Sequence, residues 1–312
     1  MRPAVNYLLE PVIGICRFSF CGNGDWAAYS AVKSDTDIDL LRLEQAEQLY
    51  DDARMALRFH LFETFLLPSL KAQKDPNFVL IVLTSDIMPA KYLKRLRTLC
   101  ESDERLLLIV SDETTVHDAL MPEIKRLNSF LSRPLVQFRI DDDDCLSTDY
   151  VFQLRRYMQR LGDMMPIAYS RSAGLVITSY AKDEATHVYQ VNLPFNSMGT
   201  AIRVHGERTI FSFGHGALLK RFPAIVDNAG MGFLSIKIDG HDARPVCLEE
   251  PGFRRTHVPV NEADLPVILS KWFSFLGDKD GDRPKALLRG VEEAAALVAP
   301  TLPARTRHLR AV

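Results

Sequence analysis

Four consecutive aspartates at residues 141–144 form the stretch whose residue types most clearly indicate chemistry. Two like charges about 4 Å apart repel by ~4 kcal/mol at an effective dielectric constant near 20, so a partly buried cluster needs a cation, raised pKa values or side chains that point apart. Side chains alternate along extended backbone, which places Asp141 and Asp143 on one face and Asp142 and Asp144 on the other. Because hard carboxylate oxygens suit Mg²⁺ or Mn²⁺ held jointly with phosphates, the pattern predicts a metal-diphosphate site rather than a solvated acidic loop.

A strand is expected directly before the aspartates and a helix directly after them. In residues 135–140 every second side chain is apolar and points to one side, as in a strand. Ser147 or Thr148 can cap the helix, with Asp149 in its first turn. Open α/β sheets bind ligands at the carboxyl ends of their strands, so the aspartates are expected at the ligand-binding edge.

The first half of the chain alternates apolar strand-like runs with amphipathic helical patterns. Strands are predicted at 12–20, 78–83, 105–110 and 135–140, and helices at 43–67 (one long helix or two joined, with a bend at Pro68), 89–100 and 116–130. After residue 162 the elements are shorter: strands at 175–180 and 187–193 as a hairpin, 200–204 and 233–238, and helices at 217–222, 263–276 and 284–297. This order predicts an α/β fold with a mainly parallel sheet flanked by helices over residues 1–160 and a more irregular half over 161–312, together one continuous domain.

Composition limits the class of protein. Of 312 residues, 47% are hydrophobic and 25% charged, and the net charge is -2, so no basic surface indicates nucleic acid. The five cysteines have no C-x-x-C spacing, which indicates neither a disulfide framework nor a zinc cluster. No signal-peptide pattern and no apolar run long enough to span a membrane is found, so we expect a cytoplasmic protein. The basic tail at 305–310 could touch anionic lipid on the inner face of the membrane.

A glycine-containing loop at residues 21–26 follows the first predicted strand. It has neither the Lys of a P-loop nor the third glycine of a dinucleotide fingerprint. Its position still suits the wall of a nucleotide site, where Arg17 could meet a phosphate and Trp26 could stack on a base or sugar. The alternatives are a structural ion pair for Arg17 and core packing for Trp26. Arg139 could likewise pair with a neighbouring acid or contact a diphosphate.

Several motifs stand in order before and within the aspartate stretch: Arg58-Phe59-x-Leu61-Phe62-Glu63, Leu67-Pro68-Ser69-Leu70-x-x-Gln73, Asp75-x-x-Phe78 and Phe138-Arg139-Ile140-Asp141-Asp142-Asp143-Asp144. Together they resemble a bacterial rhamnosyltransferase family with the GT-A (Rossmann-like) glycosyltransferase fold. The resemblance covers most of residues 12–160. It implies a metal-dependent transferase that moves a sugar, rhamnose in the family's label, from a nucleotide-diphosphate donor to a glycan or lipid-linked glycan acceptor. The donor would occupy the first half and the acceptor the second.

The same resemblance implies roles for particular residues. Asp141 would bind the nucleotide sugar together with Arg17, Trp26 and Arg139. The divalent metal, Mn²⁺ or Mg²⁺, would be held by Asp141 and Asp143, with Asp144 as a further ligand, and would act as a Lewis acid on the leaving diphosphate. A histidine from the second half would complete the metal site, with His241 as first choice and His215 as second. Either histidine could instead be a hydrogen-bonded loop residue.

The catalytic base is not identified by any spacing. An inverting transferase needs a carboxylate to take the proton of the acceptor hydroxyl. The candidates in the second half are Asp183, Glu184, Asp227, Asp239 and Asp242. A retaining transferase would need no such base. Two alternatives stay open: a catalytically inactive protein that binds nucleotide sugar or glycan, and a sugar nucleotidyltransferase, which would normally carry basic residues in its N-terminal glycine-rich loop.

Overall fold

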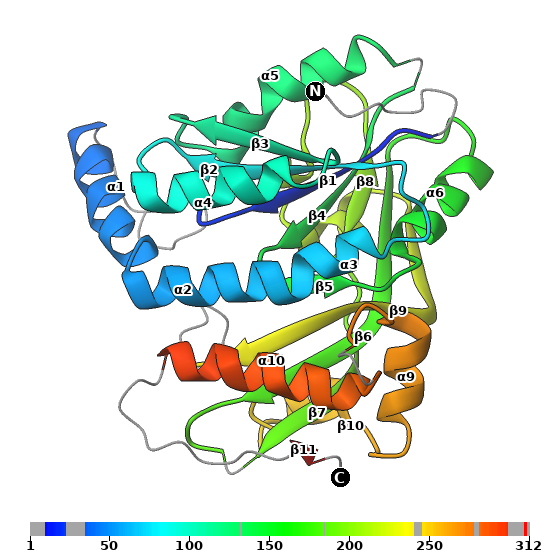
Figure 1. Cartoon of the computed structure of the whole chain (residues 1–312). Helices are drawn as coiled ribbons and strands as arrows, with labels where there is room; N and C mark the ends of the chain where they lie inside the picture. The colour runs from blue at the N-terminus through cyan, green and yellow to red at the C-terminus, as the bar shows by residue number, and fades with distance from the viewer. Residues whose placement is uncertain are drawn as a thin grey trace.

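The computed structural model describes residues 10–22, 35–131, 133–183, 185–239, 245–277, 281–298 and 309–310 (Figure 1). Its strands are β1 (Val12–Arg17), β2 (Val79–Ser85), β3 (Leu106–Ser111), β4 (Val136–Asp141), β5 (Asp144–Leu146), β6 (Ile167–Ser179), β7 (Thr186–Asn192), β8 (Ala201–Arg203), β9 (Ala224–Ile238), β10 (His257–Pro259) and β11 (Leu309–Arg310). Its longer helices are α1 (Asp35–Leu49), α2 (Asp52–Leu61), α4 (Ala90–Glu101), α5 (Val116–Asn128), α6 (Tyr150–Arg160), α9 (Leu265–Trp272) and α10 (Arg283–Val298). The shorter ones are η2 (Phe62–Leu66), α3 (Leu67–Lys71), η3 (Ile210–Ser212), η4 (His215–Ala217), α7 (Leu218–Arg221) and α8 (Pro251–Thr256).

One mixed sheet joins strands from both halves of the chain, in the order β10-β7-β6-β8-β4-β1-β2-β3. The strands β4, β1, β2 and β3 are parallel, and helices cover them, which confirms the predicted α/β class. The near-continuous apolar runs of β1 and β2 reflect burial on both faces. β4 is the fourth strand in chain order and lies beside β1, so its carboxyl end opens at the centre of the sheet.

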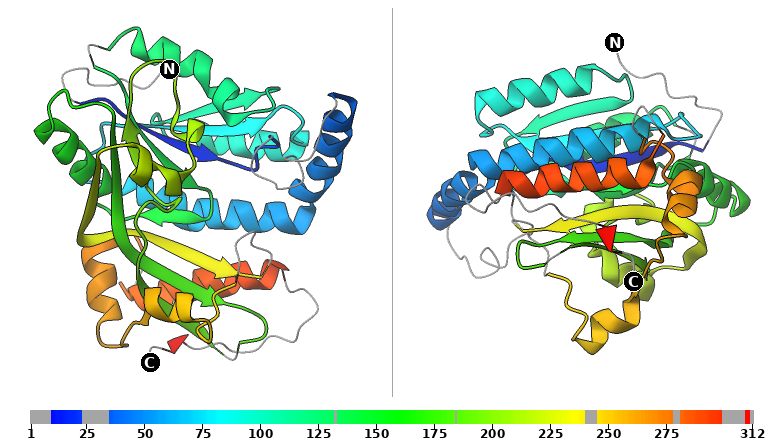
Figure 2. Two further views of the ribbon diagram at one scale, coloured as in Figure 1. Left: turned by 180° about the vertical axis from the view of Figure 1, so that it is seen from behind. Right: turned by 60° about the horizontal axis from the view of Figure 1, so that its bottom comes forward.

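Two strands of the second half, β6 and β9, are longer than the sequence predicts, whereas β8 is shorter. β6 has 13 residues and β9 has 15, and the two strands pair in parallel. The predicted hairpin of β6 and β7 is confirmed by their antiparallel pairing. The prediction missed the first part of β6 because Ser170, Arg171 and Ser172 are polar, although all three are buried. The Ser170 hydroxyl accepts a hydrogen bond from the Phe195 N–H, and Arg171 pairs with Asp149. Local alternation does not report such distant contacts. Figure 2 shows these long strands running from the parallel part of the sheet into its other end.

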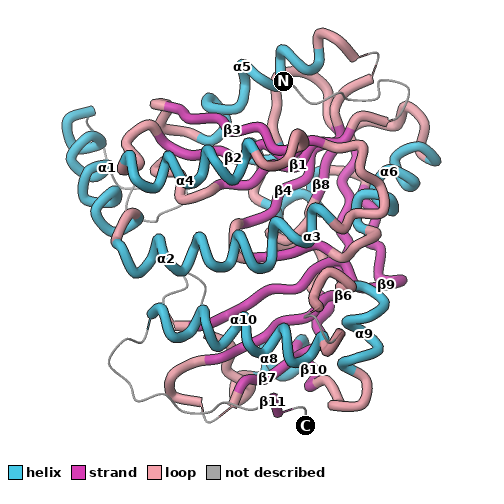
Figure 3. Tube along the Cα trace, viewed as in Figure 1, coloured by secondary structure: helices cyan, strands magenta, loops and turns pink. Residues whose placement is uncertain are grey.

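A continuous helical rod, defined here as α2, η2 and α3, lies between the parallel strands and α10 (Figure 3). Asp51 begins it by accepting the backbone N–H groups of Ala53 and Arg54. The bend expected at Pro68 is wrong, because the rod continues to Lys71. Its π-helical turn, in which the Leu67 N–H donates to the Phe62 carbonyl, precedes the proline and accommodates it.

The rod is apolar on two sides because it packs against two parts of the core. Phe59 and Phe62 lie against Phe18 after β1, with ring centroids 4.9 and 5.1 Å apart from it. Leu61 and Phe65 belong instead to the cluster that includes α10 and β9. His60 Nε2 lies 2.9 Å from the Gly290 carbonyl of α10, so this side chain links the rod to that helix. Among the described residues no helix is both long and apolar enough to cross a membrane.

Gly14 allows β1 to pack closely against the strand that carries the aspartates. A Cβ atom there would lie 2.4 Å from Phe138 Cζ and 2.6 Å from Leu80 Cδ1. We expect Gly14→Ala to lower the free energy of unfolding by about 1–3 kcal/mol through overpacking. Urea denaturation followed by circular dichroism measures this. Gly252→Ala is the matched control, because nothing lies within 4 Å of its added Cβ; equal midpoints for the two variants would contradict the expectation.

Candidate functional site

The four aspartates form a tight bend, called here the acidic turn (residues 141–144). Asp141 ends β4, Asp142 and Asp143 make the turn, and Asp144 begins β5. β5 pairs antiparallel with β9, where Ser235 stands opposite Asp144. The predicted alternation of the side chains therefore does not hold, because the backbone is extended only up to Asp141. The helix expected directly after the aspartates begins later, at Tyr150 of α6, behind β5.

Arg58 of the rod binds the middle of the acidic turn. Its Nη1 atom lies 2.8 Å from Asp142 Oδ1 and 2.8 Å from Asp143 Oδ2, and all three side chains are at most 10% exposed. Burial and repulsion from Asp143 and Asp141 nevertheless raise the pKa of Asp142 to about 7, against the opposing charge of Arg58. Asp142 and Asp143 thus share one arginine rather than facing opposite ways. Arg58 stands in one of the sequence motifs, but no sequence pattern indicates its contact with the aspartates.

Asp141 meets two other arginines on the more open side of the turn. Arg17 Nη2 lies 3.2 Å and Arg139 Nη2 3.6 Å from its Oδ1 atom, and the side chain of Asp141 is 25% exposed. Both guanidinium groups lie over the ring of Phe211, at 5.1 and 4.8 Å from its centroid. Burial raises the pKa of Asp141, but the charges of Arg17 and Arg139 outweigh it and the net pKa is lowered. Asp141 is therefore an ionised carboxylate at the carboxyl ends of β1 and β4.

His215, the second-choice metal ligand, lies in η4 within electrostatic reach of this group. Burial and the charges of Arg139 and Arg17 lower its pKa, while Asp141 opposes the shift, so the ring is neutral near pH 7. The structure thus brings together Arg17, Arg139, Asp141 and His215. The first-choice ligand His241 lies outside the described residues. So do Trp26, Asp242, Glu184 and residues 305–308 of the basic tail.

Asp144 faces β9 on the inner side of the turn. It is 2% exposed, and its Oδ1 atom has no hydrogen-bond partner within the described part of the chain. Burial and the charge of Asp143 raise its pKa, and Lys237 opposes the shift. Burial lowers the pKa of Lys237, but Asp144, Asp143 and Asp141 outweigh it and the net pKa is raised. Lys237 was missed by the sequence analysis, although a lone lysine in the run FLSIKI was a usable signal.

The residues that follow the acidic turn are held by a buried ion pair and by hydrogen bonds with Gln73, which follows the rod. Arg171 Nη1 and Nη2 lie 2.7 and 3.3 Å from the two carboxylate oxygens of Asp149, and its guanidinium lies 5.1 Å from the centre of the Trp272 ring. Asp149, not Ser147 or Thr148, is the N-cap residue of α6. Gln73 bonds both the Ser147 carbonyl and the Val151 N–H.

Two of the candidate bases have structural partners. Asp227 is buried, accepts the Tyr169 hydroxyl at 3.1 Å and lies 3.7 Å from Arg171 Nε. Asp239 accepts the Ala181 N–H at 2.5 Å. Neither contact singles out a base that is open to an acceptor.

The acidic turn and the arginines beside it can bind ligands of either charge. Arg17 and Arg139 offer guanidinium groups to an anion, and the carboxylates offer hard oxygen donors to a cation. The oxygen donors available to a cation are the unpartnered Oδ1 atom of Asp144 and the partly exposed carboxylate of Asp141, which also pairs with Arg17 and Arg139. Among the described residues, no three His, Cys, Asp or Glu side chains already converge in a metal-binding group. A cation would therefore need a further ligand or a small rearrangement.

Comparisons with known proteins give one family and several solved structures that align with low TM-scores. Residues 11–250 match the family model described as "Putative rhamnosyl transferase". No curated protein matches. The crystal structure of S. aureus TarS 1–349 in complex with UDP aligns at TM-score 0.35 and 10% identity, over 95% of this chain and 93% of that one. A "putative nucleotide-diphospho-sugar transferase" from Desulfovibrio desulfuricans G20 aligns at TM-score 0.31 and 10% identity, over 80% and 91%.

Proposed function

The chain belongs to the rhamnosyl transferase family and is a glycosyltransferase, and from this premise we propose that it moves a sugar, rhamnose in the family's label, from a nucleotide-diphosphate donor to a glycan or lipid-linked glycan. The donor binds at the carboxyl ends of β1 and β4. The acceptor binds on the side of the second half of the chain.

The observation that carries this proposal is that Arg17 and Arg139 converge on Asp141, with both guanidinium groups over the Phe211 ring. Arginines bind phosphate oxygens through paired, charge-assisted hydrogen bonds. Two of them at the ends of adjacent parallel strands suit a diphosphate, because open α/β sheets bind ligands at this edge. When the sugar leaves, negative charge grows on the diphosphate, and fixed guanidinium groups stabilise that charge without having to reorganise.

The proposed enzyme also uses a divalent cation, Mn²⁺ or Mg²⁺. Asp141, Asp143 and Asp144 would hold it, with His241 or His215 as the additional ligand. The bound cation would supply Lewis-acid stabilisation of the leaving diphosphate. The unpartnered, buried Oδ1 atom of Asp144 supports this assignment, since a buried carboxylate oxygen without a partner is costly. His215 is neutral near pH 7, so a ring nitrogen can coordinate a metal ion or its N–H can donate a hydrogen bond to a phosphate oxygen.

Thermal-shift titration with UDP, GDP, CDP, ADP and dTDP, each with and without Mn²⁺, tests the donor site. At a hundred times its dissociation constant, the correct nucleotide should stabilise the fold by about 2.7 kcal/mol. We expect the effect to be larger with Mn²⁺. If none of the nucleotides raises the melting temperature under either condition, the proposed function is wrong. Nucleotide binding without sugar transfer to any acceptor would identify the inactive binding protein.

A further inference from the structure

We propose that Arg58 is the positioning residue of the acidic turn. Its positive charge binds Asp142 and Asp143 to the rod and so fixes the direction in which Asp141 and Asp144 face. This inference rests on the proposed donor site, which it deepens. In this proposal Arg58 affects donor binding through the acidic turn and does not itself contact the donor.

The geometry of the contact supports a positioning role. A single nitrogen, Nη1 of Arg58, donates to carboxylates of two successive residues at 2.8 Å each. Such a contact can form only if the backbone turns between Asp142 and Asp143 and brings both side chains to the same side. Charge-assisted hydrogen bonds in a buried site are strong and directional. Arg58 therefore selects one shape of the turn.

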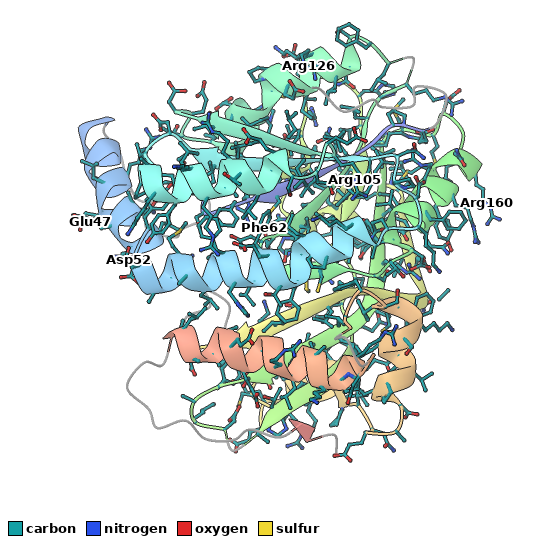
Figure 4. The ribbon with its side chains drawn as sticks, viewed as in Figure 1. Glu47, Asp52, Phe62, Arg105, Arg126 and Arg160 are labelled. Atoms are coloured by element: carbon teal, nitrogen blue, oxygen red, sulfur yellow. The ribbon has the colours of Figure 1, made fainter. Side chains whose placement is uncertain are left out.

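Arg58 is separate from the contacts that hold the following backbone. Ser69 Oγ accepts the Leu146 N–H at 3.3 Å, and the Lys74 N–H donates to the Thr148 carbonyl at 2.7 Å. Gln73 binds on both sides of Asp149. These residues belong to the end of the rod or follow it, whereas Arg58 lies before the π-helical turn marked by Phe62 (Figure 4). Loss of the Arg58 side chain should leave residues 146–151 in place and release only the turn.

The charge of Arg58 also offsets part of the repulsion among the four adjacent carboxyl groups. Without it, Asp142 and Asp143 would be buried beside each other and would repel Asp141 and Asp144. The turn would then relieve this repulsion by moving the side chains apart, which would change the direction of Asp141 relative to Arg17 and Arg139. Removing a residue that hydrogen-bonds to a metal-binding side chain and orients it typically weakens metal affinity by about 10- to 100-fold.

Hydrogen exchange followed by mass spectrometry tests the positioning claim without any ligand. In Arg58→Met, amides of residues 142–145 should exchange about tenfold faster or more, whereas residues 146–151 keep the wild-type rate. Arg58→Lys should restore slow exchange in large part, because one ammonium group can serve both carboxylates. Arg126→Met is the control: it removes an arginine of α5 that pairs with Glu123 (Figure 4). If the methionine variant fails to fold, Arg58→Gln, which keeps hydrogen-bond donors without charge, replaces it.

Isothermal titration with Mn²⁺ and the nucleoside diphosphate that best stabilises the wild type gives the second readout. We expect the dissociation constant to rise about 10- to 100-fold in Arg58→Met and to recover in Arg58→Lys. Unchanged exchange at residues 142–145, or unchanged affinity, would overturn the role of Arg58. If exchange responds as expected but no nucleotide binds the wild type, the donor site is wrong and Arg58 remains the residue that holds the turn.

Discussion

Replacing Arg171 with methionine is expected to lower the free energy of unfolding by about 3–5 kcal/mol, because removing one partner of a buried ion pair leaves an uncompensated charge. Arg171 is 2% exposed, pairs with both oxygens of Asp149 and lies 3.7 Å from Asp227. Space around it is also tight: a Cβ on Gly230 would lie 2.6 Å from its Nη2 atom. Urea denaturation at pH 7 measures the loss.

The same variant should show a changed dependence on pH. Burial raises the pKa of Asp149, but the hydrogen bonds and charge of Arg171 outweigh it and the net pKa is lowered. In the wild type this pair therefore contributes stability above the unfolded pKa of about 3.9, and the contribution is lost as the pH falls through the lowered folded pKa. Without Arg171, burial should raise the pKa of Asp149, so the stability deficit of Arg171→Met should shrink between pH 7 and pH 4.5.

Two further variants separate the ion pair from general packing loss. Arg95→Met removes an arginine whose ion pair with Glu63 is exposed, and it should cost less than about 1 kcal/mol. Arg171→Met combined with Asp149→Asn should recover part of the stability, because the buried charge is removed as well. A deficit for Arg171→Met that does not change with pH would mean that lost packing against Trp272, rather than charge, is responsible.

Sequence patterns identified those parts of the fold that are local. The apolar runs of β1 and β2 were recognised because parallel strands are buried on both faces, and the aspartates were correctly expected at the end of β4. The start of β6 was missed, because Ser170, Arg171 and Ser172 are polar and resemble a loop, whereas all three are buried in the structure. Asp149, the main partner of Arg171, lies 22 residues away in the chain.

The shape of the site depends on pairs that are even more distant. Arg58 and Asp142 are separated by 84 residues, and Arg17 and Asp141 by 124. Alternation predicted that Asp142 and Asp143 would point to opposite sides, and this failed because it assumes extended backbone. Arg58 instead stabilises a turn at those residues. The residue types of the site could thus be recognised from sequence, whereas their partners could not.

Asp141→Asn is expected to reduce sugar transfer on the order of 10²–10³-fold, because it removes an ionised carboxylate from the proposed cation and diphosphate site while keeping the size of the side chain. Asp141 is also the most exposed acid of the turn, so the substitution should leave the fold unchanged. Release of nucleoside diphosphate from the donor that the wild type accepts gives the rate. Asp163→Asn is the control, since that side chain is 83% exposed.

Measurements of nucleotide affinity for Asp141→Asn give a sharper test, because the difference between the variant and the wild type should depend on whether Mn²⁺ is present. Without Mn²⁺, Asp141 competes with the diphosphate for Arg17 and Arg139, so the variant should bind the nucleotide as tightly as the wild type or more tightly. With Mn²⁺, the wild type should gain affinity and the variant should not. A variant that keeps both the gain with Mn²⁺ and normal transfer would show that Asp141 serves only to pair with the two arginines.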